Sequence, residues 1–192
     1  MKSGFIAIVG RPNVGKSTLM NKLIKEKVAI VSDKAGTTRD QIKGIVNIKE
    51  NQYIFVDTPG IHKPKHLLGE HMTDVAIDTL NDVDLIMFML NGTSNISTGD
   101  IFVNEHVKEA NTPVIIIINK IDKLTDEEIE EKKEEIKKKL GNYDNIITLS
   151  AEYGIGIHKI FEEAEPYLSN EIWFYPEDYY TDLPVNKIVI ET

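Results

Sequence analysis

The chain has 192 residues, with 41% hydrophobic and 28% charged side chains, the composition of a soluble globular protein with room for one full-sized domain. Its net charge of −9 gives no general attraction to nucleic acid, although a local basic patch could still bind RNA. The absence of cysteine excludes disulfides and thiolate metal sites and fits a cytoplasmic protein. We expect no transmembrane segment, because no apolar run approaches the roughly 18 residues that a membrane helix needs. We also expect no signal peptide, because residues 1–4 lead straight into a strand.

Residues 10–17 fit the pattern G-x-x-x-x-G-K-S/T of a phosphate-binding loop. An apolar, β-branched stretch at 5–9 predicts a strand before the loop, and the apolar spacing at 17–24 predicts a helix after it. The two glycines let the backbone turn sharply, so that its N–H groups and the positive end of the helix dipole face an anion. Lys16 would then reach the outer phosphates, and the Ser17 hydroxyl would bind Mg²⁺.

Beyond the loop, strands and helices alternate, which predicts an α/β fold with a mostly parallel sheet and helices on both faces. One exception is a hairpin at 42–49 and 53–56, which we expect to place one antiparallel strand at an edge of a six-stranded sheet. The remaining strands after the hairpin are expected at 85–90, 114–118 and 146–149. Helices are expected at 70–80, 99–110, 126–140 and 157–168.

A second motif, Asp57-Thr58-Pro59-Gly60, follows the second strand of the hairpin. In an open α/β sheet, ligands bind at the carboxyl ends of the strands. An aspartate there can hold a water on Mg²⁺ opposite Ser17, as the second acid of a nucleoside-triphosphate site does, and the N–H of Gly60 can approach a terminal phosphate. Together with the loop upstream, this motif predicts a nucleoside-triphosphate site.

A third motif, Asn119-Lys120-Ile121-Asp122, closes the strand at 114–118. The Asp122 carboxylate can accept hydrogen bonds from N1–H and the exocyclic amine of guanine, whereas adenine offers neither donor in that arrangement. The motif therefore favours a guanine nucleotide. The alternative is a strand-end turn in which the asparagine and aspartate cap the next helix. Backbone N–H groups after the last strand would complete the base pocket, at Ser150, Ala151 and Glu152.

These motifs, together with Thr37 and Thr38, resemble the translation-factor-related GTPases of bacteria and, in detail, the Era-type GTPases. The likeness to the Era type lies in residues 10–19 and 34–39, and in residues 174–179, which look like the segment that joins an Era-type GTPase domain to its RNA-binding KH domain. The resemblance implies a Ras-like P-loop GTPase fold, a three-layer sandwich, over residues 1–170. It also implies a linker at 171–192 toward a KH domain that this chain does not include, so we expect the natural protein to extend further.

The resemblance further implies a molecular switch that binds GTP and hydrolyses it to GDP and phosphate. Its expected role is the assembly of the small (30S) ribosomal subunit and the maturation of 16S rRNA. The expected partners are GTP, GDP, the small subunit and 16S rRNA, with the RNA bound through the KH domain and no DNA bound. We expect a monomer in the cytoplasm, and the resemblance implies the inner membrane as a second, peripheral location.

Within this resemblance, Lys16, Thr38 and Gly60 are the expected catalytic residues. Ser17 and Thr38 would bind Mg²⁺ directly, with Thr37 as the alternative to Thr38, and Asp57 would bind the ion through water. The nucleotide-binding residues that the motifs and the resemblance imply are Gly10, Arg11, Pro12, Asn13, Val14, Gly15, Lys16, Ser17, Thr18, Asp57, Thr58, Pro59, Gly60, Ile61, Asn119, Lys120, Ile121, Asp122, Ser150, Ala151 and Glu152.

The residue after Gly60 is Ile61, where many GTPases have a glutamine that orients the attacking water. Isoleucine cannot form that hydrogen bond, so another group must help. In relatives with this loop sequence, an asparagine at the place of Asn13 helps to hold a K⁺ ion beside the phosphates. We therefore expect K⁺-stimulated turnover, with Asn13 and the backbone at 32–34 as ligands. The alternative is that Asn13 only stabilises the turn of the loop.

Three other functions remain open at this point. One is an ATP-using P-loop enzyme, against which the Asn119–Asp122 motif argues. Another is a nucleotide-binding module without turnover, against which Lys16, Ser17, Thr38 and Asp57 argue. The last is a sister GTPase that acts in large-subunit assembly or tRNA modification; such GTPases carry an additional GTPase or helical domain that this chain lacks.

Overall fold

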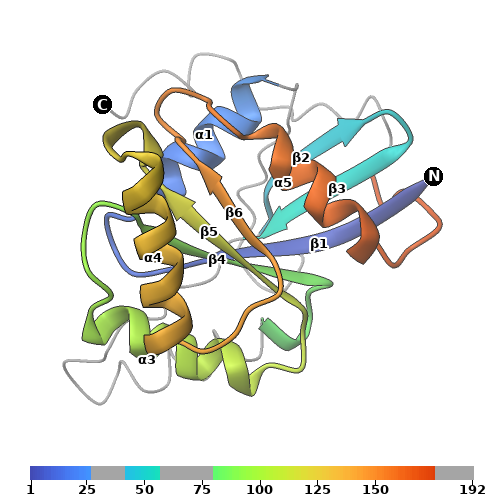
Figure 1. The fold of residues 1–192 in the computed structure, drawn as a ribbon. Coiled ribbons are helices and arrows are strands. Elements are labelled where there is room, and N and C mark those ends of the chain that lie inside the picture. Colours follow the sequence, from blue (N-terminus) through green and yellow to red (C-terminus); the bar gives the residue numbers. More distant parts are fainter. Residues whose placement is uncertain (27–41, 57–79, 176–192) are drawn as a thin grey trace.

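The structure is a computed structural model that describes residues 1–26, 42–56 and 80–175 (Figure 1). Its centre is a six-stranded sheet with the strand order β2-β3-β1-β4-β5-β6. Every neighbouring pair is parallel except β2 and β3, which form the expected antiparallel hairpin with β2 at the edge. The strands are β1 (Lys2–Val9), β2 (Ile42–Ile48), β3 (Asn51–Val56), β4 (Leu85–Asn91), β5 (Val114–Asn119) and β6 (Ile146–Leu149).

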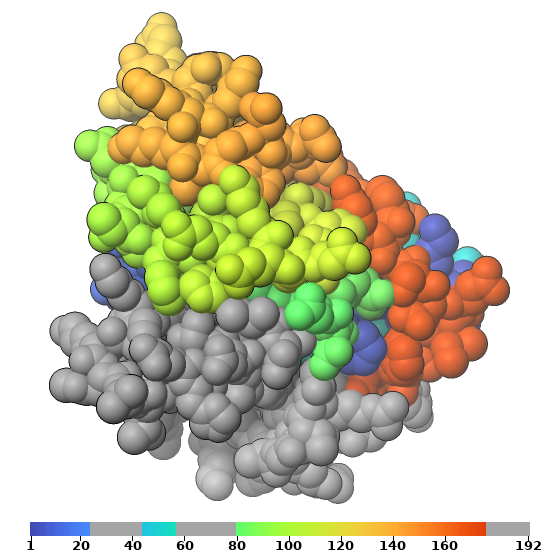
Figure 2. All heavy atoms as spheres, turned by 90° about the horizontal axis from the view of Figure 1, so that it is seen from below, coloured from blue at the N-terminus to red at the C-terminus, as the bar shows by residue number. Residues whose placement is uncertain are grey.

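Helices cover both faces of this sheet, as the alternation of elements predicted. One face packs on α1 (Lys16–Glu26) and α5 (His158–Ala164), and the other packs on α3 (Thr98–Glu109) and α4 (Asp126–Lys139). The space-filling view shows α3 and α4 side by side on their face (Figure 2). The arrangement is a three-layer α/β sandwich, and the predicted fold class is confirmed.

Side-chain alternation along the strands builds the two cores between these layers. In β5, Ile115 and Ile117 face α1 and α5, whereas Ile116 and Ile118 face α3 and α4, and all four are fully buried. Successive side chains of a strand point to opposite faces, so a continuous apolar run fits a strand that is covered on both sides.

Local sequence signals fix where the helices begin and end. Ser97 and Asp100 form a capping box at the start of α3, and Thr125 and Glu128 form another at the start of α4. The last helix is shorter than the expected 157–168: α5 ends at Ala164 and passes into the 3₁₀ turn Glu165–Tyr167. This turn contains Pro166, which has no N–H for a helical hydrogen bond.

The segment after Leu168 packs against the amino ends of β1 and β3, at the edge of the sheet away from the phosphate-binding loop. Ser3 and Asn170 exchange backbone hydrogen bonds of 2.8 and 3.1 Å. The side chain of Gln52, which is fully buried, accepts hydrogen bonds from the N–H groups of Phe174 and Tyr175 and donates one to the Tyr175 carbonyl. Residues 171–175, expected to belong to a linker, therefore pack on the sheet.

Some expected elements lie outside the described residues. The predicted helix at 70–80 is one of them, except for its last residue, the buried Leu80. The polar segment at 33–40, which holds Thr37 and Thr38, and the motif at 57–60 are others, as is the chain from residue 176 onward. None of the helices in residues 1–26, 42–56 and 80–175 has both the length and the apolar character to cross a bilayer.

Candidate functional site

Three loops meet at the carboxyl edge of the sheet. They follow β1, β5 and β6, and they contain the phosphate-binding loop, the Asn119–Asp122 motif and the segment that starts at Ser150. Parallel strands bring their carboxyl ends to the same edge, which is where open α/β sheets bind ligands. The structure thus brings together all of the predicted site residues that it describes.

The phosphate-binding loop depends on its two glycines for distinct reasons. Gly10 has φ 149°, and a Cβ there would lie 2.4 Å from the backbone oxygen of Met89. Gly15 has φ 108°, and a Cβ there would lie 2.3 Å from Nδ2 of Asn119. L side chains rarely adopt these dihedral angles, and neither site has room for one. Between the glycines, the fully buried Val14 anchors the loop in the core.

Lys16 holds the loop from its inner side. Its Nζ donates hydrogen bonds to the backbone oxygens of Gly10 at 2.6 Å and Arg11 at 2.9 Å. Lys16 is also the first residue of α1, and Ser17 and Thr18 lie exposed in the first turn. An ammonium group at a helix amino end, where the backbone N–H groups have no helical partner, makes a binding site for an anion.

Asn119 ties the phosphate-binding loop to the loop after β6. Its side chain is buried, with 2% exposed, and its Nδ2 donates to the Val14 backbone oxygen at 2.8 Å. Its Oδ1 accepts from the Ala151 N–H at 2.9 Å. Lys120 adds a second tie, because its Nζ lies 3.2 Å from the Asn13 backbone oxygen. Asn119 was predicted to contact the nucleotide; in the structure its amide joins three loops.

Asp122 is exposed and held by Ser150. The Ser150 Oγ donates to Oδ1 of Asp122 at 2.5 Å. Ser150 is itself fully buried, and it exchanges two backbone hydrogen bonds with Ile155, of 2.9 and 3.1 Å. A rigid turn therefore orients a carboxylate toward solvent at the edge of the sheet. Ala151 is buried beside it, and Glu152 is exposed.

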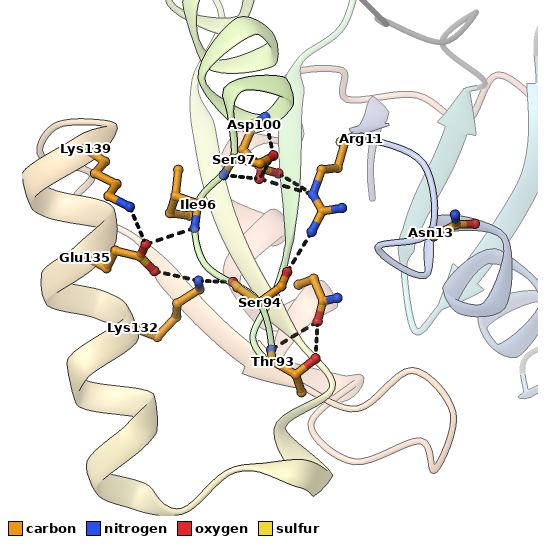
Figure 3. Close-up of polar contacts among 12 residues, drawn as sticks. Arg11, Asn13, Thr93, Ser94, Ile96, Ser97, Asp100, Lys132, Glu135 and Lys139 are labelled. Carbon is orange, nitrogen blue, oxygen red and sulfur yellow. Dashed lines mark hydrogen bonds and ion pairs between the residues drawn. The ribbon is translucent and has the colours of Figure 1, made fainter.

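Arg11 points away from the inside of the loop (Figure 3). Its Nε lies 3.1 Å from both carboxylate oxygens of Asp100, and its Nη2 donates to the Ser94 Oγ at 2.6 Å. Only its backbone, therefore, lines the inner side of the phosphate-binding loop. Sequence reasoning missed Ser94 and Asp100 as supports of the loop. The Ser97-x-x-Asp100 pattern is typical of a helix start, and nothing in it indicates this contact.

The remaining predicted residues lie outside the described part of the chain. They comprise the Mg²⁺ ligands Thr38 and Asp57, the residues Thr58, Pro59, Gly60 and Ile61, and the 32–34 backbone proposed for K⁺. Within residues 1–26, 42–56 and 80–175, no group of three or more acidic or histidine side chains could hold a metal by itself. Of the proposed Mg²⁺ ligands, only Ser17 lies among the described residues, and it is exposed in the first turn of α1.

The phosphate-binding loop lies at the amino end of α1, and the loops after β5 and β6 hold the Asp122 carboxylate at the same edge of the sheet. This arrangement defines the class of P-loop nucleotide-binding proteins. Residues 5–120, more than half of the chain, match the family model described as 50S ribosome-binding GTPase. The chain belongs to this family of GTPases.

The relatives narrow the resemblance to the Era type, as the motifs predicted. GTPase Era of Fusobacterium nucleatum subsp. nucleatum is 57% identical over 192 residues, which make up 100% of this chain and 65% of that protein. The chain thus spans about two thirds of the length of this relative.

Two solved structures of Era agree with this result. A Tyr-to-Ala variant of Aquifex aeolicus Era bound to GDP and AlF4⁻ is 41% identical, with a TM-score of 0.79, covering 98% of this chain and 64% of that one. Era in complex with MgGDPNP and nucleotides 1506–1542 of 16S ribosomal RNA is 42% identical, also with a TM-score of 0.79, covering 96% and 63% of the two chains.

Proposed function

We propose that this chain binds GTP at the carboxyl edge of its sheet and hydrolyses it to GDP and phosphate, as a switch in assembly of the small ribosomal subunit and maturation of 16S rRNA. The observation that carries the proposal is the Asn119 bridge, which fixes a phosphate cradle and an oriented carboxylate within one site. A site with both halves fixed can recognise the base and the phosphates of one nucleotide together.

Asp122 would select guanine. Its carboxylate accepts from the N1–H and the 2-amino group of guanine, and the Ser150 hydroxyl keeps it from rotating away. Against adenine, one carboxylate oxygen would face an acceptor nitrogen instead of a donor. A site built for hydrogen bonds rejects a ligand that leaves them unmade.

Lys16 and the loop N–H groups would bind the β- and γ-phosphates. The lysine Nζ lies on the inner side of the loop and could move from the carbonyl oxygens of Gly10 and Arg11 onto phosphate oxygens. Ser17, with Thr38, would bind Mg²⁺ directly, and Asp57 would bind it through water. When bound, Mg²⁺ would neutralise charge that develops on the phosphate oxygens. Gly60 would add a backbone N–H at the γ-phosphate.

Asn13 would hold K⁺ with backbone oxygens of residues 32–34, in place of the water-orienting side chain that Ile61 cannot supply. Asn13 lies exposed at the turn of the loop with φ 64°, a conformation that asparagine tolerates better than most residues. The test is turnover in KCl and in NaCl at equal ionic strength. K⁺ should raise the rate of GTP turnover, and equal rates in the two salts would overturn the proposed K⁺ site at Asn13.

The names of the relatives support the ribosomal part of the proposal. The curated relative reported above is a GTPase Era, and a solved Era holds part of 16S ribosomal RNA. We propose that residues 1–170 are the GTPase domain and that 171–192 lead toward a KH domain that binds this RNA, with the protein a monomer in the cytoplasm. The second candidate is a role on the large subunit, favoured by the family's description as 50S ribosome-binding.

The experiment is phosphate release by the purified chain with GTP or ATP, beside Lys16→Ala as the inactive control. We expect release from GTP alone and a loss of about 100-fold or more in kcat for the variant. Equal use of ATP would overturn the guanine assignment. A chain that binds GDP but releases no phosphate from GTP would be a binding module without turnover. Pull-down of 30S or 50S subunits in each nucleotide state, by the protein with the proposed KH domain included, then separates the two ribosomal roles.

A further inference from the structure

We propose that Arg11 is a positioning residue, which holds the phosphate-binding loop in shape from its outer side and thereby slows the dissociation of bound nucleotide. The inference rests on the proposed function, because it concerns the same site. It assigns to Arg11 a role other than contact with phosphate.

The contact between Arg11 and Asp100 joins residues from two layers of the fold. Asp100 lies in α3 with 3% of its side chain exposed, and both of its oxygens are 3.1 Å from Nε of Arg11. Its carboxylate also accepts from two uncharged donors, the N–H and the hydroxyl of Ser97, at 2.9 and 2.6 Å. A buried carboxylate needs a cation nearby, and Arg11 supplies it.

The loop is otherwise held from the inner side and from the base side. Lys16 binds the carbonyls of Gly10 and Arg11, and the other two ties come from Asn119 and Lys120. Among the described hydrogen bonds of the loop, those of the Arg11 side chain are the ones that reach α3 and the loop before it. The N–H groups that would bind phosphate belong to the backbone of this loop, so any movement of the loop moves them as well.

The anchor for Arg11 is itself held by α4 (Figure 3). The backbone oxygen of Ser94 accepts from Nζ of Lys132; this side chain is only 5% exposed and pairs with Glu135 at 2.7 Å. Glu135 also accepts from the Ile96 N–H at 2.9 Å and from Lys139 at 2.8 Å. The segment at 94–97 is therefore fixed between Arg11 and α4 and gives the arginine an immobile partner.

Guanidinium geometry explains why this position suits arginine. The planar head places Nε against Asp100 and Nη2 against Ser94 at the same time. A lysine would keep the charge, but its donors all extend from one nitrogen, so it could not place separate nitrogens on Asp100 and Ser94 as Nε and Nη2 do. Lysine should thus retain the ion pair while allowing the loop to shift.

The experiment measures the dissociation rate of a fluorescent GDP from the full chain and from the variants Arg11→Ala, Arg11→Lys and Ser94→Ala. We expect dissociation about tenfold faster for Arg11→Ala and about threefold faster for the other two, since each loses one or more hydrogen bonds to the loop support. Glu130→Gln is the matched control, because it breaks an exposed ion pair of α4, with Lys133, that does not touch this network.

A merely structural role predicts a different pattern. In that case the melting temperatures fall, while variants that remain folded release GDP at the wild-type rate, and that result would overturn the inference. If Arg11→Ala does not fold, Arg11→Lys and Ser94→Ala decide the question on the same readout. The two proposals fail separately: a wild-type chain that binds no guanine nucleotide overturns the proposed function and the inference with it. Wild-type binding with unchanged release in the variants overturns the inference alone.

Discussion

The phosphate half and the base half of the site are built from different parts of the chain. The phosphate half is a shape of the backbone, which needs glycine at two positions and is supported by lysine inside and arginine outside. The base half is a set of side chains that hydrogen bonds within the protein hold in place: Ser150 donates to Asp122, and Asn119 accepts from the Ala151 N–H. If the proposed function holds, the difference places selectivity in the base half, because backbone N–H groups bind any phosphate whereas an oriented carboxylate accepts only some bases.

The largest effect should come from Gly15→Ala, which strikes the point where the halves meet. The added Cβ would need a strained φ of 108° and would lie 2.3 Å from Asn119 Nδ2, so the bridge must break. We expect a loss of about 3 kcal/mol or more in unfolding free energy and no measurable GTP binding. Urea unfolding and fluorescent-nucleotide titration measure both.

Gly99→Ala is the matched control for that variant. Its Cβ would meet Ser97 and Arg11 only at ordinary contact distances of 3.6 and 3.9 Å, and Gly99 lies in the first turn of α3. Alanine in a helix should stabilise the fold by about 0.5–1 kcal/mol. A Gly15→Ala protein as stable as this control would contradict the steric argument.

The next largest effect, on nucleotide affinity, should come from Asp122→Asn, which changes the base half and leaves the phosphate half intact. An amide offers one acceptor and one donor, so it loses the bond from the 2-amino group of guanine and suits the 2-oxo group of xanthine. We expect GTP affinity to fall about 100-fold and xanthosine triphosphate affinity to rise. Unchanged preference in competition binding would remove Asp122 from the base site.

A smaller effect, on stability, should follow from Glu135→Gln in the outer support of the phosphate half. Burial acts to raise the pKa of Glu135, but hydrogen bonds from Lys132, Lys139 and the Ile96 N–H lower that pKa to about 2, from 4.5. A lowered pKa stabilises the fold above pH 4.5, and this stabilisation is lost as the pH falls toward 2. We therefore expect the variant to be about 2 kcal/mol less stable at pH 7, with the difference vanishing across that window.

Glu130→Gln again serves as the comparison, now for stability. Its carboxylate is 70% exposed and pairs with Lys133 at the same spacing in the same helix. Exposed pairs contribute little, so the change in unfolding free energy should stay below about 0.5 kcal/mol at any pH. Equal losses of unfolding free energy for Glu135→Gln and Glu130→Gln would mean that the burial of Lys132 does not strengthen its ion pair with Glu135.

The smallest effect should be Ser150→Ala, which frees Asp122 without removing it. The carboxylate keeps its charge and its acceptors but loses a hydrogen bond of 2.5 Å that orients it. We expect the dissociation constant for GDP to rise about fivefold, in keeping with one hydrogen bond of about 1 kcal/mol. Isothermal titration measures this, and an affinity equal to that of the wild type would make the base half less dependent on preorganisation than proposed.

The sequence was sufficient for the sheet, its helical layers and the motifs, because each depends on local patterns. The alternation of strand and helix and the Gly10–Ser17 spacing are visible within a few residues of each other. Pro166, which ends α5 early, was also visible, but the apolar spacing through Leu168 favoured a longer helix.

The long-range contacts could not be predicted in the same way. Arg11 and Asp100 are 89 residues apart, and Asn119 meets Val14 across 105. Nothing local distinguishes an asparagine that binds a base from one that ties loops together, since both need the same amide. Sequence reasoning therefore named residues that the structure, where it describes them, brings together, and for Arg11 and Asn119 it missed the contacts that their side chains make.

The Gln52 contact joins the end of the described chain to a central strand of the sheet. One end of this strand leads into Asp57, and the other holds Tyr175 by hydrogen bonds to both its N–H and its carbonyl. The four steps from Gln52 to Val56 span about 13 Å, at roughly 3.3 Å per residue. Residues 52–56 are all buried, so solvent ions do not enter the space between the two ends. Gln52 thus connects the segment at 174–175 to the strand that leads into the Asp57 motif, and Gln52→Ala would remove three hydrogen bonds at the end of β3 far from the phosphate-binding loop.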